Sequence, residues 1–237
     1  MNVNKENALH DILEQFELMA KLVYHQLDLM ENILNSGTVS VDEQILSEIE
    51  INEVRIDEFE TNISDKIIDM IVLQKPVASD LRKTMAAYQM VSNLERIGDQ
   101  IKNIVKALRK VNDTEIYSHM SNVISNMMMS SIIMVKKSVE SFIDSDNEAA
   151  IWTIKNDDVV DEMNHKLIKE TITKSKFPEK TQQLLFTFIG LNNIISNIER
   201  IADHATNIAE ASIYSNSGEN LRHNKTRGIQ SGPESAE

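Results

Sequence analysis

The sequence predicts an all-α protein made of two tandem three-helix bundles related by internal duplication. Three observations support this prediction. Glycine and proline are scarce, at 6 and 3 of 237 residues, and long helices avoid both. Apolar residues recur near the helical period, as in Ile97, Ile101, Ile104 and Leu108. The third observation is that one sequence pattern occurs twice at a fixed separation.

Five breaks divide the chain into six expected helices of roughly 30 residues each. The breaks fall at residues 36–38, Pro76, residues 112–114, residues 144–146 and Pro178. The S-x-x-E pattern of a capping box occurs at Ser40 with Glu43 and at Ser145 with Glu148. We therefore expect these serines to begin the second and fifth helices. We expect the last helix to end near Tyr214, where the chain becomes polar.

The pattern N-x-E-R-I-x-D occurs at residues 93–99 and again at residues 197–203, an offset of 104 residues. The same offset carries Glu53 onto Asp157 and Asp57 onto Asp161. This period is far longer than that of solenoid repeats, so a duplicated bundle is the better explanation. We expect a first repeat over residues 1–111, a second over residues 112–214 and a polar C-terminal tail over residues 215–237.

Composition narrows the classes of function. The formal net charge is −13, and such a surface repels nucleic acids and anionic membranes while it suits cations or basic partners. The absence of cysteine excludes disulfides, thiolate metal sites and cysteine catalysis. No apolar run is long enough to span a bilayer, and residues 1–14 do not resemble a signal peptide. We therefore expect a cytoplasmic protein that does not span a membrane.

Each repeat carries two pairs of acidic residues spaced four apart, which places both members of a pair on one helix face. The pairs are Glu53/Asp57 and Glu95/Asp99 in the first repeat, and Asp157/Asp161 and Glu199/Asp203 in the second. Asp57 precedes Pro76 by 19 residues and Glu95 follows it by 19. An antiparallel hairpin that turns at Pro76 therefore brings the acids of the first repeat to one level.

Carboxylates that converge in this way repel one another unless protons or cations neutralise them. Arg55, Arg96 and Arg200 supply some positive charge, and a multivalent metal would supply more. Oxygen ligands suit Mg, Ca, Mn or Fe, and His204 is a candidate nitrogen ligand beside Asp203. We predict metal sites at the eight acids of the two repeats.

Two alternatives stay open. A ferritin-like di-metal carboxylate protein needs two E-x-x-H motifs, and Glu162 with His165 supplies only one, because Thr61 stands at the equivalent position of the first repeat. The other alternative is a metal-free helical interaction module whose acids are solvated. No nucleophile or general base stands out in the motifs, so we expect no enzymatic activity.

Several motifs together resemble the PhoU family. They are the acidic motifs E-V-R-I-D, E-R-I-G-D, D-D-V-V-D and E-R-I-A-D, P-V-A-S-D-L-R at residues 76–82, D-H-A-T-N-I-A-E at residues 203–210 and G-E-N-L-R-H at residues 218–223. The resemblance covers residues 8–223. The second repeat departs from it, because Leu184 stands where the first repeat has Asp80.

The resemblance implies a cytoplasmic regulator of phosphate transport that damps the phosphate-starvation response, a negative regulator of the phosphate regulon. It implies two partners, the ATPase subunit of a phosphate ABC transporter and a phosphate-sensing histidine kinase. It also implies metal clusters of the iron or zinc type on the acidic motifs, while the oxygen ligands keep magnesium as a further candidate. We also expect the chain to form a homodimer.

Overall fold

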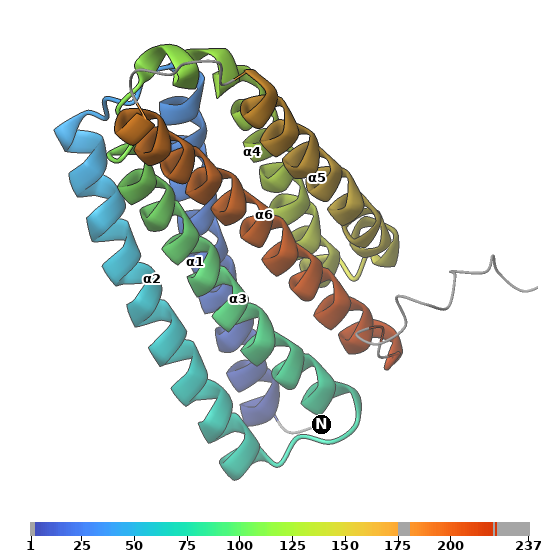
Figure 1. Cartoon of the computed structure of the whole chain (residues 1–237). Coiled ribbons are helices and arrows are strands. Elements are labelled where there is room, and N and C mark those ends of the chain that lie inside the picture. The colour runs from blue at the N-terminus through green and yellow to red at the C-terminus, as the bar shows by residue number, and fades with distance from the viewer. Residues whose placement is uncertain (1–2, 175–180, 220, 222–237) are drawn as a thin grey trace, which may run out of the picture.

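The computed structural model describes residues 3–174, 181–219 and 221, with side chains for all of these except residues 3, 164–174, 181–183 and 185. Six long helices and one short π-helix make up the described chain (Figure 1), and these residues contain no strand. The helices are α1 (Val3–Asn35), α2 (Glu43–Asp69), η1 (Met70–Gln74), α3 (Ser79–Leu108), α4 (Thr114–Ile143), α5 (Asn147–Lys174) and α6 (Thr181–Ser217). The predicted all-α class and the six long helices are confirmed.

Aspartates, not serines, cap the helices that follow the first and fourth breaks. Asp42 accepts a hydrogen bond from the backbone amide of Gln44, and Asp146 accepts two from the first turn of α5. The predicted capping boxes at Ser40 and Ser145 are therefore wrong. Ser145 has a left-handed φ of 56°, so it belongs to the turn after α4. A carboxylate also interacts favourably with the positive end of the helix dipole, which favours these caps.

The turn between α2 and α3 is irregular. The α-helix passes into the π-helix η1, and Lys75 and Ala78 then take positive φ values of 46° and 48°. Pro76, the predicted break, lies buried between them. At the other end of the chain, α6 runs to Ser217, three residues beyond the predicted end at Tyr214. The predicted break at Pro178 lies outside the described residues.

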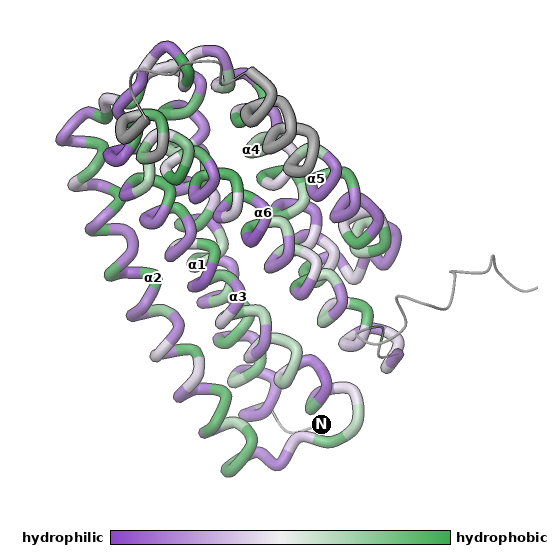
Figure 2. The backbone as a smooth tube through the Cα atoms, viewed as in Figure 1, coloured by the Kyte–Doolittle hydropathy of each residue, from purple (hydrophilic) through white to green (hydrophobic). Residues whose placement is uncertain are grey.

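Helices α1, α2 and α3 form one bundle and α4, α5 and α6 form the other (Figure 1). The two bundles are not separate bodies, because α3 packs against α6 and α1 against α4, and one hydrophobic core runs through both. The buried side chains of the described residues are mostly apolar, and apolar segments alternate with polar ones along the helices (Figure 2). The motif-bearing helices α3 and α6 are therefore held at the centre of the molecule.

Helices α3 and α6 run antiparallel in a fixed register. Asn93 lies against His204, and Ala107 lies against Gly190, so 14 residues forward along α3 correspond to 14 residues back along α6. Equivalent positions of the two repeats differ by 104 residues. The pseudo-two-fold axis therefore crosses α3 and α6 next to Arg96 and Arg200, within the two E-R-I-x-D motifs.

Candidate functional site

The four motif acids of the first repeat form one electrostatic cluster on the α2–α3 hairpin. Glu53 and Asp57 come from α2, and Glu95 and Asp99 come from α3. Burial raises the pKa of Glu95 to about 7, and the charges of Asp99, Glu60 and Asp57 add to the rise, while Arg96 opposes it. Near neutral pH, Glu95 is therefore present in both its protonated and its ionised form.

Asp57 shows the same crowding of negative charge. Its pKa is raised by desolvation first and then by the charges of Glu53 and Asp99, with Lys102 acting in the opposite direction. The side chain of Glu53 is only 12% exposed. The crowding means that the folded hairpin favours any cation or proton that joins these carboxylates.

Lys102 belongs to this cluster, and sequence reasoning missed it. Its ammonium group donates a hydrogen bond to Glu53, and this bond is the main reason that the pKa of Lys102 is raised. A signal was present, because Lys102 lies three residues after Asp99 and so shares its helix face. Lys102 and Arg96 against five acids, with Glu60 included, leave the cluster with an excess of negative charge.

The donor chemistry of the first repeat fits a hard cation, because the side chains offer carboxylate oxygens and excess negative charge. The geometry is that of a charged cluster and not of a finished ligand cage. Among the described side chains, no three histidines or acids are placed to hold one metal ion. A metal would have to draw Asp57, Glu95 and Asp99 together, with Lys102 remaining on Glu53.

The acids of the second repeat lie on the equivalent helices. Asp157 is 6% exposed on α5, Asp161 and Glu199 are half-buried, and Asp203 is exposed on α6. Helices α5 and α6 pack together, and the specific pairing of Asp161 with Glu199 stays a prediction. The repeats differ at the position of Lys102, where the second repeat has Thr206. The second repeat therefore has no lysine at the position equivalent to Lys102.

His204 serves the contact between the repeats. Its Nδ1 lies 3.0 Å from Asn93 Oδ1, which accepts the hydrogen bond, so the neutral ring carries its proton on Nδ1. Burial lowers the pKa of His204 to about 4, and the charges of Arg96 and Arg200 lower it further. The side chain is thus a neutral packing group between α3 and α6. The side chain of His165, the other histidine considered as a ligand, lies outside the described residues.

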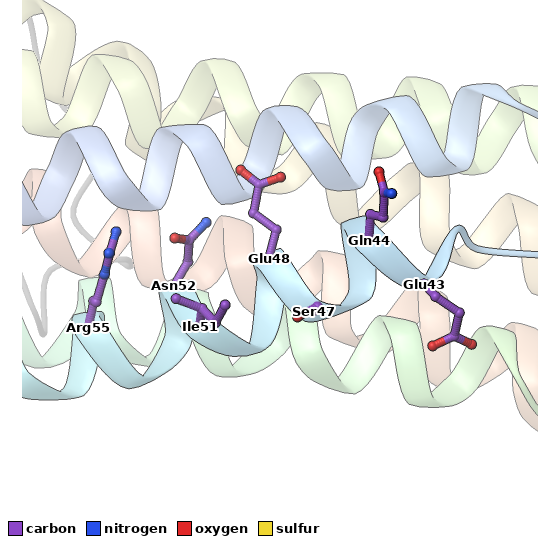
Figure 3. Close-up of a pocket in the computed structure, with 7 residues that line it drawn as sticks. All are labelled: Glu43, Gln44, Ser47, Glu48, Ile51, Asn52 and Arg55. Atoms are coloured by element: carbon purple, nitrogen blue, oxygen red, sulfur yellow. The ribbon is translucent and has the colours of Figure 1, made fainter.

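A separate hollow lies along the first half of α2 (Figure 3). It has a volume of about 510 Å³ and is lined by Glu43, Gln44, Ser47, Glu48, Ile51, Asn52 and Arg55. Oε1 of Glu48 lies 2.6 Å from Nε2 of His25 in α1. None of the eight motif acids lines this hollow, so it is not part of the acidic clusters.

Within the described part of the chain, no helix combines the length and the apolar character that crossing a bilayer requires. The described helices instead carry polar residues along most of their length, as Figure 2 shows.

Comparison with known proteins agrees with this architecture. The chain is 35% identical to the phosphate-specific transport system accessory protein PhoU homolog of Aquifex aeolicus, over 91% of this chain and 94% of that protein. It is 30% identical to the homolog of a Burkholderia species, over 91% of this chain and 89% of the relative.

Two crystal structures share the fold. PhoU from Pseudomonas aeruginosa matches with a TM-score of 0.74 and 23% identity, over 90% of this chain and 99% of that one. The phosphate transport system regulatory protein PhoU from Streptococcus pneumoniae matches with a TM-score of 0.71 and 24% identity, over 91% and 98%. The PhoU domain pattern matches twice, at residues 16–108 and 120–212, so both halves carry it. The chain therefore belongs to the PhoU family.

Proposed function

We propose that this protein is a cytoplasmic regulator of phosphate transport that restrains the phosphate-starvation response when phosphate is plentiful. The observation that carries the proposal is that both PhoU domains are present in a chain that covers about nine-tenths of relatives named phosphate-specific transport system accessory proteins. The protein acts by contact with other proteins and not by catalysis, since the motifs offer acids without a nucleophile.

The proposed partners are the ATPase subunit of a phosphate ABC transporter and a phosphate-sensing histidine kinase. The net charge of −13 favours basic patches on both partners. Contacts of this kind weaken as ionic strength rises, because salt screens exposed charges. A pull-down with the full chain at low and at high salt tests this: both partners should be retained at low salt and released at high salt.

The proposed input to this regulator is cation binding by the acidic clusters. In the first repeat, burial first and neighbouring acids second raise the pKa of both Glu95 and Asp57, and both effects favour a cation beside these carboxylates. A bound divalent or ferric ion would supply positive charge between α2 and α3. It would draw the two helices together along the face that carries Asp57, Glu95 and Asp99.

A metal-free interaction module is the second candidate, and one observation favours it. The described acids and histidines form no ready group of three ligands. Under this alternative Lys102 and protons alone balance the first cluster, and metal has no effect on stability or on partner contact. Pull-downs in chelator and in added metal separate the two candidates.

Deletion and complementation test the regulatory role. Loss of the protein should raise expression of phosphate-uptake and phosphatase genes in phosphate-rich medium, and the wild-type chain should restore repression. The Glu95→Gln/Asp99→Asn variant should restore less than wild type, while Glu50→Gln on the same hairpin should restore it fully. Unchanged expression after deletion, in rich and in starved cells alike, would remove the regulatory proposal.

A further inference from the structure

The most exposed large apolar side chains of the described residues gather at the end of the α2–α3 hairpin. Val72, Leu73 and Val77 are 61%, 69% and 70% exposed. Ile68 and Leu81 extend the group on either side. We call residues 68–83 the hairpin tip. Apolar groups that gather in this way at a surface commonly mark an interaction site.

The backbone of the hairpin tip holds these side chains outward. Met70 anchors η1 in the core, where Thr84 contacts its sulfur at 3.4 Å. Lys75 and Ala78, both at positive φ, then turn the chain back around the buried Pro76. Non-glycine residues pay a conformational cost at positive φ, so the surrounding structure must enforce this turn.

The hairpin tip is the end of two adjacent helices and lies at one extremity of the bundle (Figure 1), with apolar segments beside polar ones (Figure 2). A projecting apolar end suits insertion into a soft, planar surface, whereas an amphipathic partner helix is usually received by a groove. The shape therefore favours a lipid surface as the partner.

The charge of the hairpin tip points to the same partner. Residues 68–83 contain Lys75, Arg82 and Lys83 against Asp69 and Asp80. Asp80 forms an ion pair with Lys5 of α1, so the excess at this end is positive. The chain as a whole has a net charge of −13 and is repelled by anionic membranes. The positive hairpin tip is a part of the described surface where this repulsion is reversed. Basic side chains around exposed apolar ones are typical of proteins that bind anionic bilayers peripherally.

We propose that the hairpin tip binds the surface of an anionic phospholipid bilayer. Val72, Leu73 and Val77 would enter the boundary between headgroups and acyl chains, and Lys75 and Lys83 would contact lipid phosphates. A few apolar side chains and two lysines give weak, reversible attachment. This inference goes beyond the regulatory role and does not rest on it.

Vesicle co-sedimentation of the full chain tests the proposal. Wild type should sediment with vesicles of phosphatidylglycerol and phosphatidylcholine, and much less with phosphatidylcholine alone. The Val72→Ser/Leu73→Ser/Val77→Ser variant should lose about tenfold or more in partitioning. The matched control, Ile51→Ser/Val54→Ser, replaces apolar residues of α2 that are 52% and 54% exposed, and it should bind like wild type.

A fluorescent reporter and a charge variant add independent readouts. Leu73→Trp in a Trp152→Phe background should shift its emission to the blue with anionic vesicles, and brominated lipids should quench it. Lys75→Glu/Lys83→Glu should weaken binding most at low salt. Circular dichroism melting of each variant establishes that it is folded.

Two results would overturn the proposal. One is that the wild type fails to bind anionic vesicles at low salt. The other is that the triple serine variant binds as well as its control. If vesicles are not bound but the triple variant loses its protein partners in pull-downs, the hairpin tip is a protein contact instead. The regulatory role is judged separately, by expression after deletion.

Discussion

Glu95 is the residue at which the crowding of acids should be most measurable. Its pKa is raised to about 7 by burial and by neighbouring acids, against an ordinary value of 4.5. An acid whose folded pKa exceeds its unfolded pKa stabilises the fold below the unfolded value and loses that contribution as pH rises through the folded value. The Glu95 contribution should therefore be complete below pH 4.5 and lost above about pH 7.

The substitution Glu95→Gln removes the charge and keeps the size of the side chain. A rise of about 2.5 pKa units corresponds to roughly 3.4 kcal/mol at full strength. Glu95 is only partly buried, and solvent screening reduces this to roughly 1–2 kcal/mol. We expect the variant to be more stable than wild type by that amount at pH 8, and nearly equal to it at pH 4.

Urea unfolding followed by circular dichroism, in buffer with a chelator, measures the difference. The chelator matters because a bound cation would hide the repulsion. Glu50→Gln, an exposed acid on the outer face of α2, is the control and should change stability little at either pH. A Glu95→Gln variant that is less stable than wild type at pH 8, or that gains equally at both pH values, would refute the reasoning.

Three further predictions concern stability. The folded pKa of His204 is about 4, below its ordinary 6.5, so the contribution of His204 to folding stability is present above pH 6.5 and is lost as pH falls toward 4. The melting temperature of His204→Gln should therefore fall less between pH 7 and pH 5 than that of wild type. An added Cβ at Gly190 would lie 2.9 Å from a Val111 methyl and 3.3 Å from a backbone oxygen, so Gly190→Ala should lower the free energy of unfolding by about 1–3 kcal/mol in urea unfolding. An added Cβ at Gly98 would meet only a movable isoleucine side chain at 3.3 Å, so the stability of Gly98→Ala should stay within about 1 kcal/mol of wild type. Lys102→Met leaves the largely enclosed Glu53 without its ion pair, so it should lower the free energy of unfolding by about 1–3 kcal/mol at pH 8. The loss should be smaller when a divalent metal is added, and melting with and without metal measures the difference.

The repeat and the hairpin could be read from the sequence because both depend on chain distance. The fixed offset required two equivalent bundles, and equal distances from Pro76 brought Asp57 and Glu95 to one level. Helix ends were less predictable. A serine and an aspartate near the same break are comparable caps, and the backbone conformation of Ser145 decided between them.

Other features depend on side-chain geometry that the pattern does not contain. Lys102 lies on the predicted face, but its contact with Glu53 depends on the reach and rotamer of a long side chain. The exposure of Val72 and Val77 could not be predicted either, because apolar periodicity does not show whether anything packs over the end of a hairpin. The second acidic cluster was placed on its helices, and its detailed pairing remains a prediction.

Metal content tests whether the acids of each repeat bind a cation. Wild type and Glu95→Gln/Asp99→Asn should be purified without chelator, analysed for metals per chain, and melted with and without added metal. We expect metal in the wild type and partial loss in the variant, because the second repeat keeps its own ligands on α5 and α6. Metal should raise the melting temperature of wild type more than that of the variant, since binding to the folded state adds stability. Equal metal content and an identical melting shift in both proteins would contradict the claim for the first repeat, and no metal in either would contradict it for both.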